Sequence, residues 1–127
     1  EGKTLAQLIE AHGMQEFLQI EGRHVRSIAG DGLLVSPGGS VVYVPETMEY
    51  LQKLGTIVYL DLPLPELEQR LGDLAARGVA IAPDMTLADL FNEREPLYKK
   101  YAAISVPCSR RSAEDVAQAV VAKLSQR

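Results

Sequence analysis

The chain has 127 residues with a formal net charge of −4 at pH 7, and 46% of them are hydrophobic. This length suits one domain around a single core, and the negative charge gives no reason to expect binding to nucleic acid or to an anionic membrane. The single cysteine excludes an internal disulfide framework and favours the cytoplasm, and no apolar run approaches the about 20 residues that span a bilayer.

The first segment, Gly-Lys-Thr at residues 2–4, matches the end of the phosphate-binding pattern G-x-x-x-x-G-K-[ST]. A phosphate loop needs several consecutive free amides, which one glycine before Lys3 does not provide. Only about 35 residues separate Gly2 from the glycine pair at residues 38–39, too few for the helices that follow such a loop. We therefore expect Thr4 to begin a helix rather than to bind phosphate.

Helices and short apolar strands then alternate along the chain. Apolar spacing predicts two short helices in the first 26 residues and a buried strand at residues 33–36, which leads into the turn Pro37-Gly38-Gly39. A helix that starts at Pro45 should end at Gly55, a common residue at helix ends. Residues 56–61 have the composition of a second buried strand.

The second half of the chain continues this alternation. Pro65 begins a helix, and Thr86 and Ser112 each precede a helix with an aspartate three residues later, the pattern of an N-terminal cap. Residues 103–106 are the third predicted strand. The alternation predicts a single α/β domain over residues 1–127, in which a parallel sheet lies between two layers of helices. Ligands are then expected at the carboxyl ends of the strands.

Several segments at such positions carry candidate ligand-binding residues. Gly38 and Gly39 allow a ligand to approach backbone amides, although a simple tight turn explains them equally well. Arg77 lies in a loop with Gly and Pro that could form a flap, and Arg110 and Arg111 follow the third strand, where guanidinium groups bind phosphate or stack on a base. For each of these arginines alone, an ordinary solvated loop is the simpler interpretation.

Arg94 lies in a helical stretch that Pro96 is expected to interrupt. Arginine suits bidentate binding of a carboxylate or phosphate, although most arginines on helices are simply solvated. His12 and His24 have no partners at metal-ligand spacing and are interpreted as surface residues, so the chain predicts no metal site of its own. Cys108 is interpreted as a small, partly buried residue rather than a nucleophile.

Taken in order, these segments resemble the shikimate kinase family from a little after its P-loop to its C-terminus. The family has a G-[KRM]-[ST]-I-x-x-[IL]-F helix, F-R-x-x-E, a glycine-rich turn, a V-x-Y-L strand, an arginine-bearing lid, R-x-P-L-Y and an adenine-side loop. The corresponding segments here are residues 2–9, 17–21, 36–40 and 57–61, Arg77, Arg94-Glu95-Pro96-Leu97-Tyr98 and Arg110-Arg111. The match covers essentially the whole chain, and R-x-P-L-Y with the strand pattern is its most specific part.

The resemblance implies a P-loop kinase fold of the nucleoside-monophosphate-kinase type. Such a kinase transfers the γ-phosphoryl group of Mg·ATP to the 3-hydroxyl of shikimate, a step of aromatic amino-acid biosynthesis, and we expect a cytoplasmic monomer. Its first strand, its P-loop, its Mg²⁺ ligands and the aspartate that acts on the substrate would all precede Glu1, in about 35 residues. A lid is expected at about residues 77–85.

The resemblance also implies roles for individual residues. The glycines at 38–39 would line the shikimate site with their backbone, and Arg94 would clamp the shikimate carboxylate. Arg77 would be the catalytic lid arginine that reaches the ATP phosphates as the lid closes and excludes water. Arg110 or Arg111 would flank the adenine.

Three positions depart from the family pattern. Leu18 stands where F-R-x-x-E has an arginine that binds the carboxylate, a change that should cost on the order of a few kcal/mol unless Arg23 or Arg26 substitutes. Ser40 stands at the third glycine of the turn, and the lid sequence R-P-L-L is replaced at residues 77–80. Two alternatives therefore remain open: a non-catalytic relative without an ATP site, and a related kinase that acts on another small hydroxylated metabolite such as gluconate.

Overall fold

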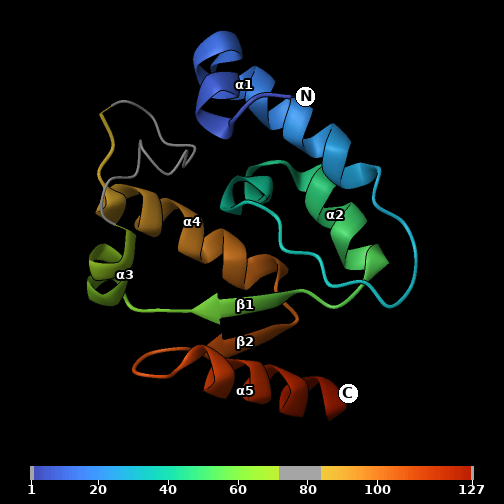
Figure 1. The fold of residues 1–127 in the computed structure, drawn as a ribbon, viewed down its shortest axis with the longest axis vertical. Coiled ribbons are helices and arrows are strands. Elements are labelled where there is room, and N and C mark those ends of the chain that lie inside the picture. The colour runs from blue at the N-terminus through green and yellow to red at the C-terminus, as the bar shows by residue number, and fades with distance from the viewer. Residues whose placement is uncertain (1, 72–83, 127) are drawn as a thin grey trace.

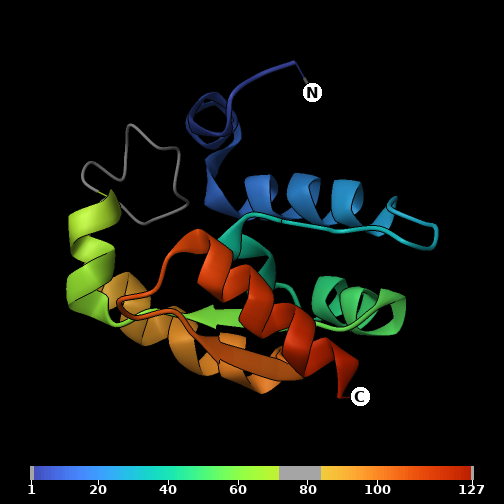
Figure 2. The ribbon, with the colours of Figure 1, turned by 60° about the horizontal axis from the view of Figure 1, so that its bottom comes forward.

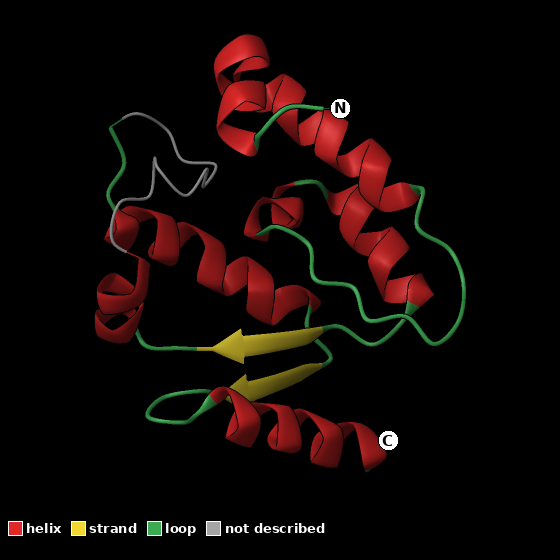
Figure 3. Cartoon of the chain, in the orientation of Figure 1, coloured by secondary structure: helices red, strands yellow, loops and turns green. Residues whose placement is uncertain are grey.

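The computed structural model describes residues 2–71 and 84–126. Helices predominate, and the strands are few and short (Figure 3). The elements occur in the order α1 (Leu5–Arg26), the 3-10 helix η1 (Gly39–Tyr43), α2 (Pro45–Leu54), β1 (Val58–Asp61), α3 (Leu64–Leu71), α4 (Leu87–Tyr101), β2 (Ile104–Pro107) and α5 (Ala113–Ser125) (Figure 1). In the described part of the chain, no helix is long and apolar enough to cross a membrane.

The two strands form a parallel sheet in which Val58 pairs with Ile104. The chain passes from β1 to β2 through α3 and α4, because parallel strands need a long crossover. Successive residues of β1 point to opposite faces: Val58 packs with the cluster that contains α5, whereas the ring of Tyr59 stacks on Tyr98 of α4 at 5.3 Å. The sheet therefore lies between α4 and α5, which agrees with the predicted three-layer α/β arrangement (Figure 2).

The predicted helix starts are confirmed by their caps. The Thr4 hydroxyl accepts a hydrogen bond from the Gln7 amide, and the Gln7 side chain accepts one from the Thr4 amide. Thr4 thus begins α1, as expected, and Thr86 with Asp89 forms the same capping box at α4. Gly13, with a φ of 78°, breaks the helical geometry inside α1, so the two predicted short helices are the two halves of this element.

Two predictions about local structure are wrong. Residues 33–36 form a loop in which Leu34 is 97% exposed, because a strand needs a neighbour and the described chain pairs only β1 with β2. Pro96 does not interrupt its helix, since α4 continues through it to Tyr101. A proline in this position removes a backbone hydrogen bond, so the surrounding packing must hold the helix together.

Buried apolar residues form three clusters, two of which position the turn at residues 37–39. The first joins α1 to the residues that follow the turn, the second joins the end of α1 to η1 and α2, and the third lies between the sheet and α5. Their buried members are Leu8, Phe17 and Leu18; Val25, Val41, Val42, Met48 and Leu51; and Leu62, Val106 and Cys108. Because η1 contributes to the first two clusters, the segment that carries the paired glycines is fixed by packing on both sides.

Phe17→Ala is expected to lower the free energy of unfolding by about 3–5 kcal/mol, because it removes a ring that is only 2% exposed and leaves a cavity in the first cluster. Val121→Ala, at a position of α5 that is 63% exposed, is the matched control and should change stability by less than about 0.5 kcal/mol. Urea-induced unfolding of both variants measures the difference. Similar losses in the two variants would contradict this assignment of the core.

Candidate functional site: a glycine turn beside a buried arginine

Gly39, the second glycine of the pair, lies against one face of α4. A Cβ atom at Gly39 would lie 2.5 Å from the hydroxyl oxygen of Tyr98 and 2.9 Å from Nη1 of Arg94, so a larger residue would displace one of them. The Tyr98 hydroxyl donates a hydrogen bond to the Gly39 carbonyl at 3.1 Å. Arg94 and Tyr98 are four residues apart and therefore share a helix face. The close approach of this face to the turn requires glycine at position 39.

Arg94 is buried, with 7% of its surface exposed, and is not the solvated helix residue that its position alone would suggest. Its Nε–H donates a hydrogen bond to the Tyr43 hydroxyl at 3.1 Å, and its guanidinium lies 5.1 Å from the centre of the Tyr43 ring. The Tyr43 hydroxyl in turn donates to Glu93 at 2.9 Å. A buried cation is costly unless it is paired in this way, so Tyr43 both stabilises and orients Arg94.

A carboxylate lies on the other side of the same turn. Glu21 of α1 is half-buried, and its two oxygens lie 2.7 and 2.8 Å from the hydroxyl of Ser40, which donates to them. A Cβ atom at Gly38 would lie 3.1 Å from Oε2 of Glu21. Burial raises the pKa of Glu21, and the Ser40 hydrogen bond and the charge of Arg94 oppose that rise without cancelling it. The turn therefore lies between an acidic and a basic side chain.

Neither Leu18 nor the two arginines that follow it in α1 is shown beside the glycine turn. Leu18 is 7% exposed and packs in the first apolar cluster. Arg26 donates a hydrogen bond from Nη1 to the Thr47 hydroxyl at 3.0 Å, which directs it towards α2, and Arg23 is exposed. The buried cation at the glycine turn therefore comes from α4, as Arg94.

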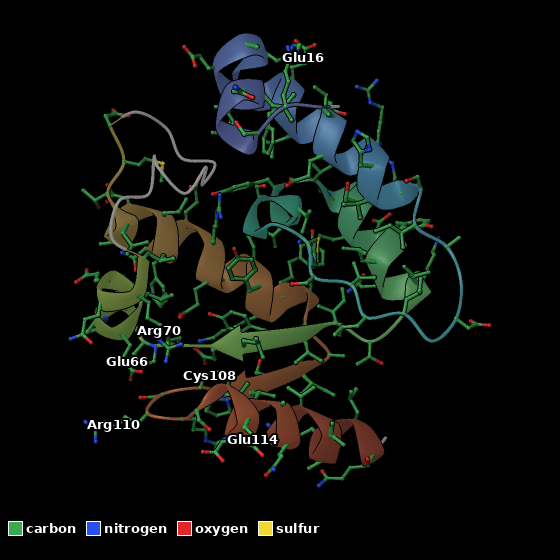
Figure 4. The ribbon with its side chains drawn as sticks, in the orientation of Figure 1. Glu16, Glu66, Arg70, Cys108, Arg110 and Glu114 are labelled. Atoms are coloured by element: carbon green, nitrogen blue, oxygen red, sulfur yellow. The ribbon has the colours of Figure 1, made fainter. Side chains whose placement is uncertain are left out.

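A second group of polar residues gathers at the carboxyl ends of the two strands. Ser109 donates a hydrogen bond to the carboxylate of Glu66, and the backbone N–H of Arg110 donates to the same carboxylate at 3.3 Å. These bonds, the Ser109 bond first, lower the pKa of Glu66. Figure 4 shows Glu66 and Arg70 on α3 near Arg110, which lies on the loop after β2. The carboxylate thus ties that loop to the start of α3.

An open hollow of about 670 Å³ lies beside this group. Its lining combines apolar rings with polar and charged groups: Pro63, Pro65, Glu66, Gln69, Ser109 and Arg110. Proline rings and guanidinium planes can stack on a flat base, and the polar groups can bind its edge.

The structure thus divides the predicted site residues into two groups. The glycines at 38–39 and Arg94 meet at one place, whereas Arg110 and Arg111 lie on the loop after β2, both exposed. Arg77 and nearly all of the predicted lid lie outside the described residues.

Three residues in these groups received no role from the sequence. Glu21 is the last residue of the F-R-x-x-E segment, so the motif contained it, but only the fold shows that it faces the turn. Tyr43 is the one polar side chain in the apolar run 41–44, which was an available signal. Glu66 follows Pro65 in the first turn of a helix after a strand, a position typical of residues near a ligand site.

Among residues 2–71 and 84–126, no three His, Cys, Asp or Glu side chains are placed to hold a metal ion. His12 pairs with Glu16 on α1 at 3.4 Å, and His24 is exposed. Burial raises the pKa of the Cys108 thiol, which favours the protonated and unreactive form. His24 thus lies at the surface, as expected, whereas Cys108 is more buried than expected, with 6% of its surface exposed.

Glu21→Gln is expected to change the pH dependence of stability. Because folding raises the pKa of Glu21, the stability that this group contributes is present at low pH and is lost as the pH rises through its folded pKa. The free energy of unfolding of the wild type relative to the variant should therefore fall as the pH rises above the usual pKa range of a glutamate carboxyl. Chemical unfolding at several pH values measures it.

Glu66→Gln is the control for this experiment, because folding lowers the pKa of Glu66. The stability that Glu66 contributes is present above its unfolded pKa and is lost as the pH falls. The free energy of unfolding of the wild type relative to Glu66→Gln should therefore rise with pH, opposite to the change expected for Glu21→Gln. The same slope for both variants would show that Glu21 is not the desolvated carboxylate of the turn.

Residues 1–125 match a sequence model of the shikimate kinase family. The shikimate kinase of Symbiobacterium thermophilum is 31% identical over a match that covers 99% of this chain and 75% of that protein. The shikimate kinase of Rhodococcus jostii is 32% identical, with 98% of this chain and 76% of the relative covered. A protein called threonine synthase-like 1 from Macaca fascicularis is 33% identical over 93% of this chain but only 16% of its own length.

The family model and the two bacterial relatives match nearly the whole chain, so the match includes both groups of residues described above. The matched region contains the glycine turn, Arg94 and the loop after β2 in one continuous span. The chain belongs to the shikimate kinase family.

Proposed function

We propose that this protein transfers the γ-phosphoryl group of ATP to the 3-hydroxyl of shikimate. The observation that carries this proposal is the buried guanidinium of Arg94 beside the glycine turn, in a chain of the shikimate kinase family. We further propose that it works as a monomer in the cytoplasm, where its single cysteine, the buried Cys108, stays reduced.

The acceptor would bind at the glycine turn. Arg94 offers parallel N–H donors that match the two oxygens of a carboxylate, and its contacts with Tyr43 hold it in place before the substrate arrives. Little side-chain freedom is then lost on binding, which favours affinity. Gly38 and Gly39 are both exposed, so the ring of the acceptor can approach their backbone closely. The turn thus fits a small hydroxy acid.

The nucleotide base would bind at the carboxyl ends of the strands. Arg110 and Arg111 would flank the adenine, and the hollow beside Arg110 has the volume of a small-molecule site, about 670 Å³. Glu66 holds the loop that carries both arginines through Ser109 and the Arg110 amide. This arrangement fixes the loop without using either guanidinium.

Phosphoryl transfer depends on positioning and on neutralising the charge of the phosphates. Arg77 is proposed to approach those phosphates from the lid, a role that concerns residues outside the described chain. Mg²⁺ is proposed to arrive with ATP, and among the described residues no three His, Cys, Asp or Glu side chains are placed to hold it. The described residues would orient the two substrates: Arg94 the carboxylate of the acceptor, and the loop after β2 the base of ATP.

A second candidate is a related domain that acts on another small hydroxylated metabolite or has no catalytic activity. Leu18 favours it, because the helix position that would hold a second carboxylate-binding arginine is apolar and buried. The match to a small part of threonine synthase-like 1 shows that a segment like this one also occurs in a protein with a different name. ADP release measured with shikimate, gluconate and other hydroxy acids distinguishes the candidates, since the proposal requires shikimate to exceed all others.

Arg94→Ala in the full-length gene product is expected to raise the KM for shikimate on the order of 100-fold, because the carboxylate loses a buried, charge-assisted partner. The KM for ATP should change by less than about threefold, since Arg94 lies at the acceptor group and not at the hollow beside Arg110. Steady-state kinetics with each substrate varied in turn measure both constants.

Lys53→Ala is the control for this prediction, because it removes an exposed positive charge near the end of α2. It should leave both constants unchanged. Arg94→Lys keeps the charge but not the bidentate geometry, and an intermediate KM is expected. A folded Arg94→Ala variant with a normal KM for shikimate would refute the acceptor role of Arg94.

A further inference from the structure

The hydroxyl of Ser40 is placed to donate a hydrogen bond to the half-buried carboxylate of Glu21. Ser40 is 4% exposed, and its Oγ lies 2.7 and 2.8 Å from the two carboxylate oxygens of Glu21. A hydroxyl has one proton, so it serves both oxygens from a position between them. Hydrogen bonds to a charged acceptor are stronger than neutral ones. Ser40 therefore locks Glu21 in place from the first turn of η1.

Glu21 and the acceptor would compete for the same cation. The positive charge that acts on Glu21 is that of Arg94, whose Nη1 faces Gly39 on the other side of the turn. Leu18, one helical turn before Glu21, is apolar and buried and cannot share this role. A half-buried carboxylate that loses a donor either takes up a proton or turns to another donor, because an unsatisfied charge is costly. Arg94 is the cation whose charge already acts on Glu21, so it is the donor that we expect Glu21 to attract when the Ser40 hydroxyl is removed.

We propose that Ser40 is a positioning residue of the acceptor site: its hydroxyl satisfies Glu21 and so keeps the Arg94 guanidinium directed at the glycine turn, where it receives the acceptor carboxylate. The proposal rests on the proposed function, because it assumes an acceptor with a carboxylate at Arg94. Ser40 acts through Glu21 and Arg94 and does not itself contact the acceptor. Ser40, which stands where the family pattern has its third glycine, thus has a specific role in this chain.

Ser40→Ala in the full-length gene product tests the proposal, because it removes only the hydroxyl and introduces no larger group. The KM for shikimate should rise about tenfold, which corresponds to about 1.4 kcal/mol. The KM for ATP and the kcat should change by less than about twofold, since the base and the transferred phosphoryl group bind elsewhere. Ser105→Ala, an exposed serine on β2, is the matched control and should leave all constants unchanged.

Two further measurements separate positioning from a general loss of structure. With the carboxamide analogue of shikimate, which carries no charge for Arg94, Ser40→Ala should change the KM by less than about twofold. In a Glu21→Gln background the side chain no longer attracts Arg94, so Ser40→Ala should again change the KM for shikimate by less than about twofold. This double-mutant cycle measures the coupling of Ser40 to Glu21 directly.

The outcomes distinguish this inference from the proposed function. A wild type that does not phosphorylate shikimate refutes both. An active wild type refutes the inference alone if Ser40→Ala leaves the KM for shikimate unchanged. The inference is also refuted if Ser40→Ala raises the KM for the carboxamide analogue as much as the KM for shikimate. It is refuted as well if Ser40→Ala raises the KM for shikimate as much in the Glu21→Gln background as in the wild type. If Ser40→Ala does not fold, Ser40→Cys replaces it, because a thiol is a weaker donor of similar shape. An unchanged KM in folded Ser40→Cys then contradicts the inference.

Discussion

The buried charge of Arg94 is the constraint around which the candidate site is built. A guanidinium that is 7% exposed must recover the hydration that it has lost, and it does so through the ring and hydroxyl of Tyr43 and through the charge of Glu21. These partners come from η1 and α1, whereas Arg94 belongs to α4. One charge therefore ties together three elements that are far apart in the sequence, and the glycine turn lies between them.

The same helix connects this turn to the sheet. Tyr98 donates a hydrogen bond to Gly39 and also stacks on Tyr59 of β1, so one side chain joins the glycine turn to the central layer. The crossover between the parallel strands places α4 on the face of the sheet opposite to α5. A change in the packing of α4 would thus move Arg94 relative to the turn. The position of Arg94 beside the glycine turn thus depends on packing contacts of α4 as well as on its own partners.

Much of the local structure could be predicted from the sequence because it depends on neighbouring residues. The caps at Thr86 and Ser112 and the strands β1 and β2 follow from short patterns. The strand expected at residues 33–36 could not be judged in this way, since a strand exists only with a partner. The family pattern identified Gly38, Gly39 and Arg94, but the burial of Arg94 and the bond between Ser40 and Glu21 arise from tertiary contacts. A pattern does not contain the distances that create them.

The central claim is that Arg94 binds the acceptor carboxylate beside the glycine turn. A crystal structure of the full-length gene product with shikimate bound tests it most directly. The acceptor role of Arg94 predicts carboxylate oxygens at about 2.7–3.0 Å from its guanidinium nitrogens, with the ring of the acceptor against residues 38–39. Shikimate bound with its carboxylate on another cation, such as Arg23 or Arg26, and more than about 5 Å from Arg94 would contradict the claim.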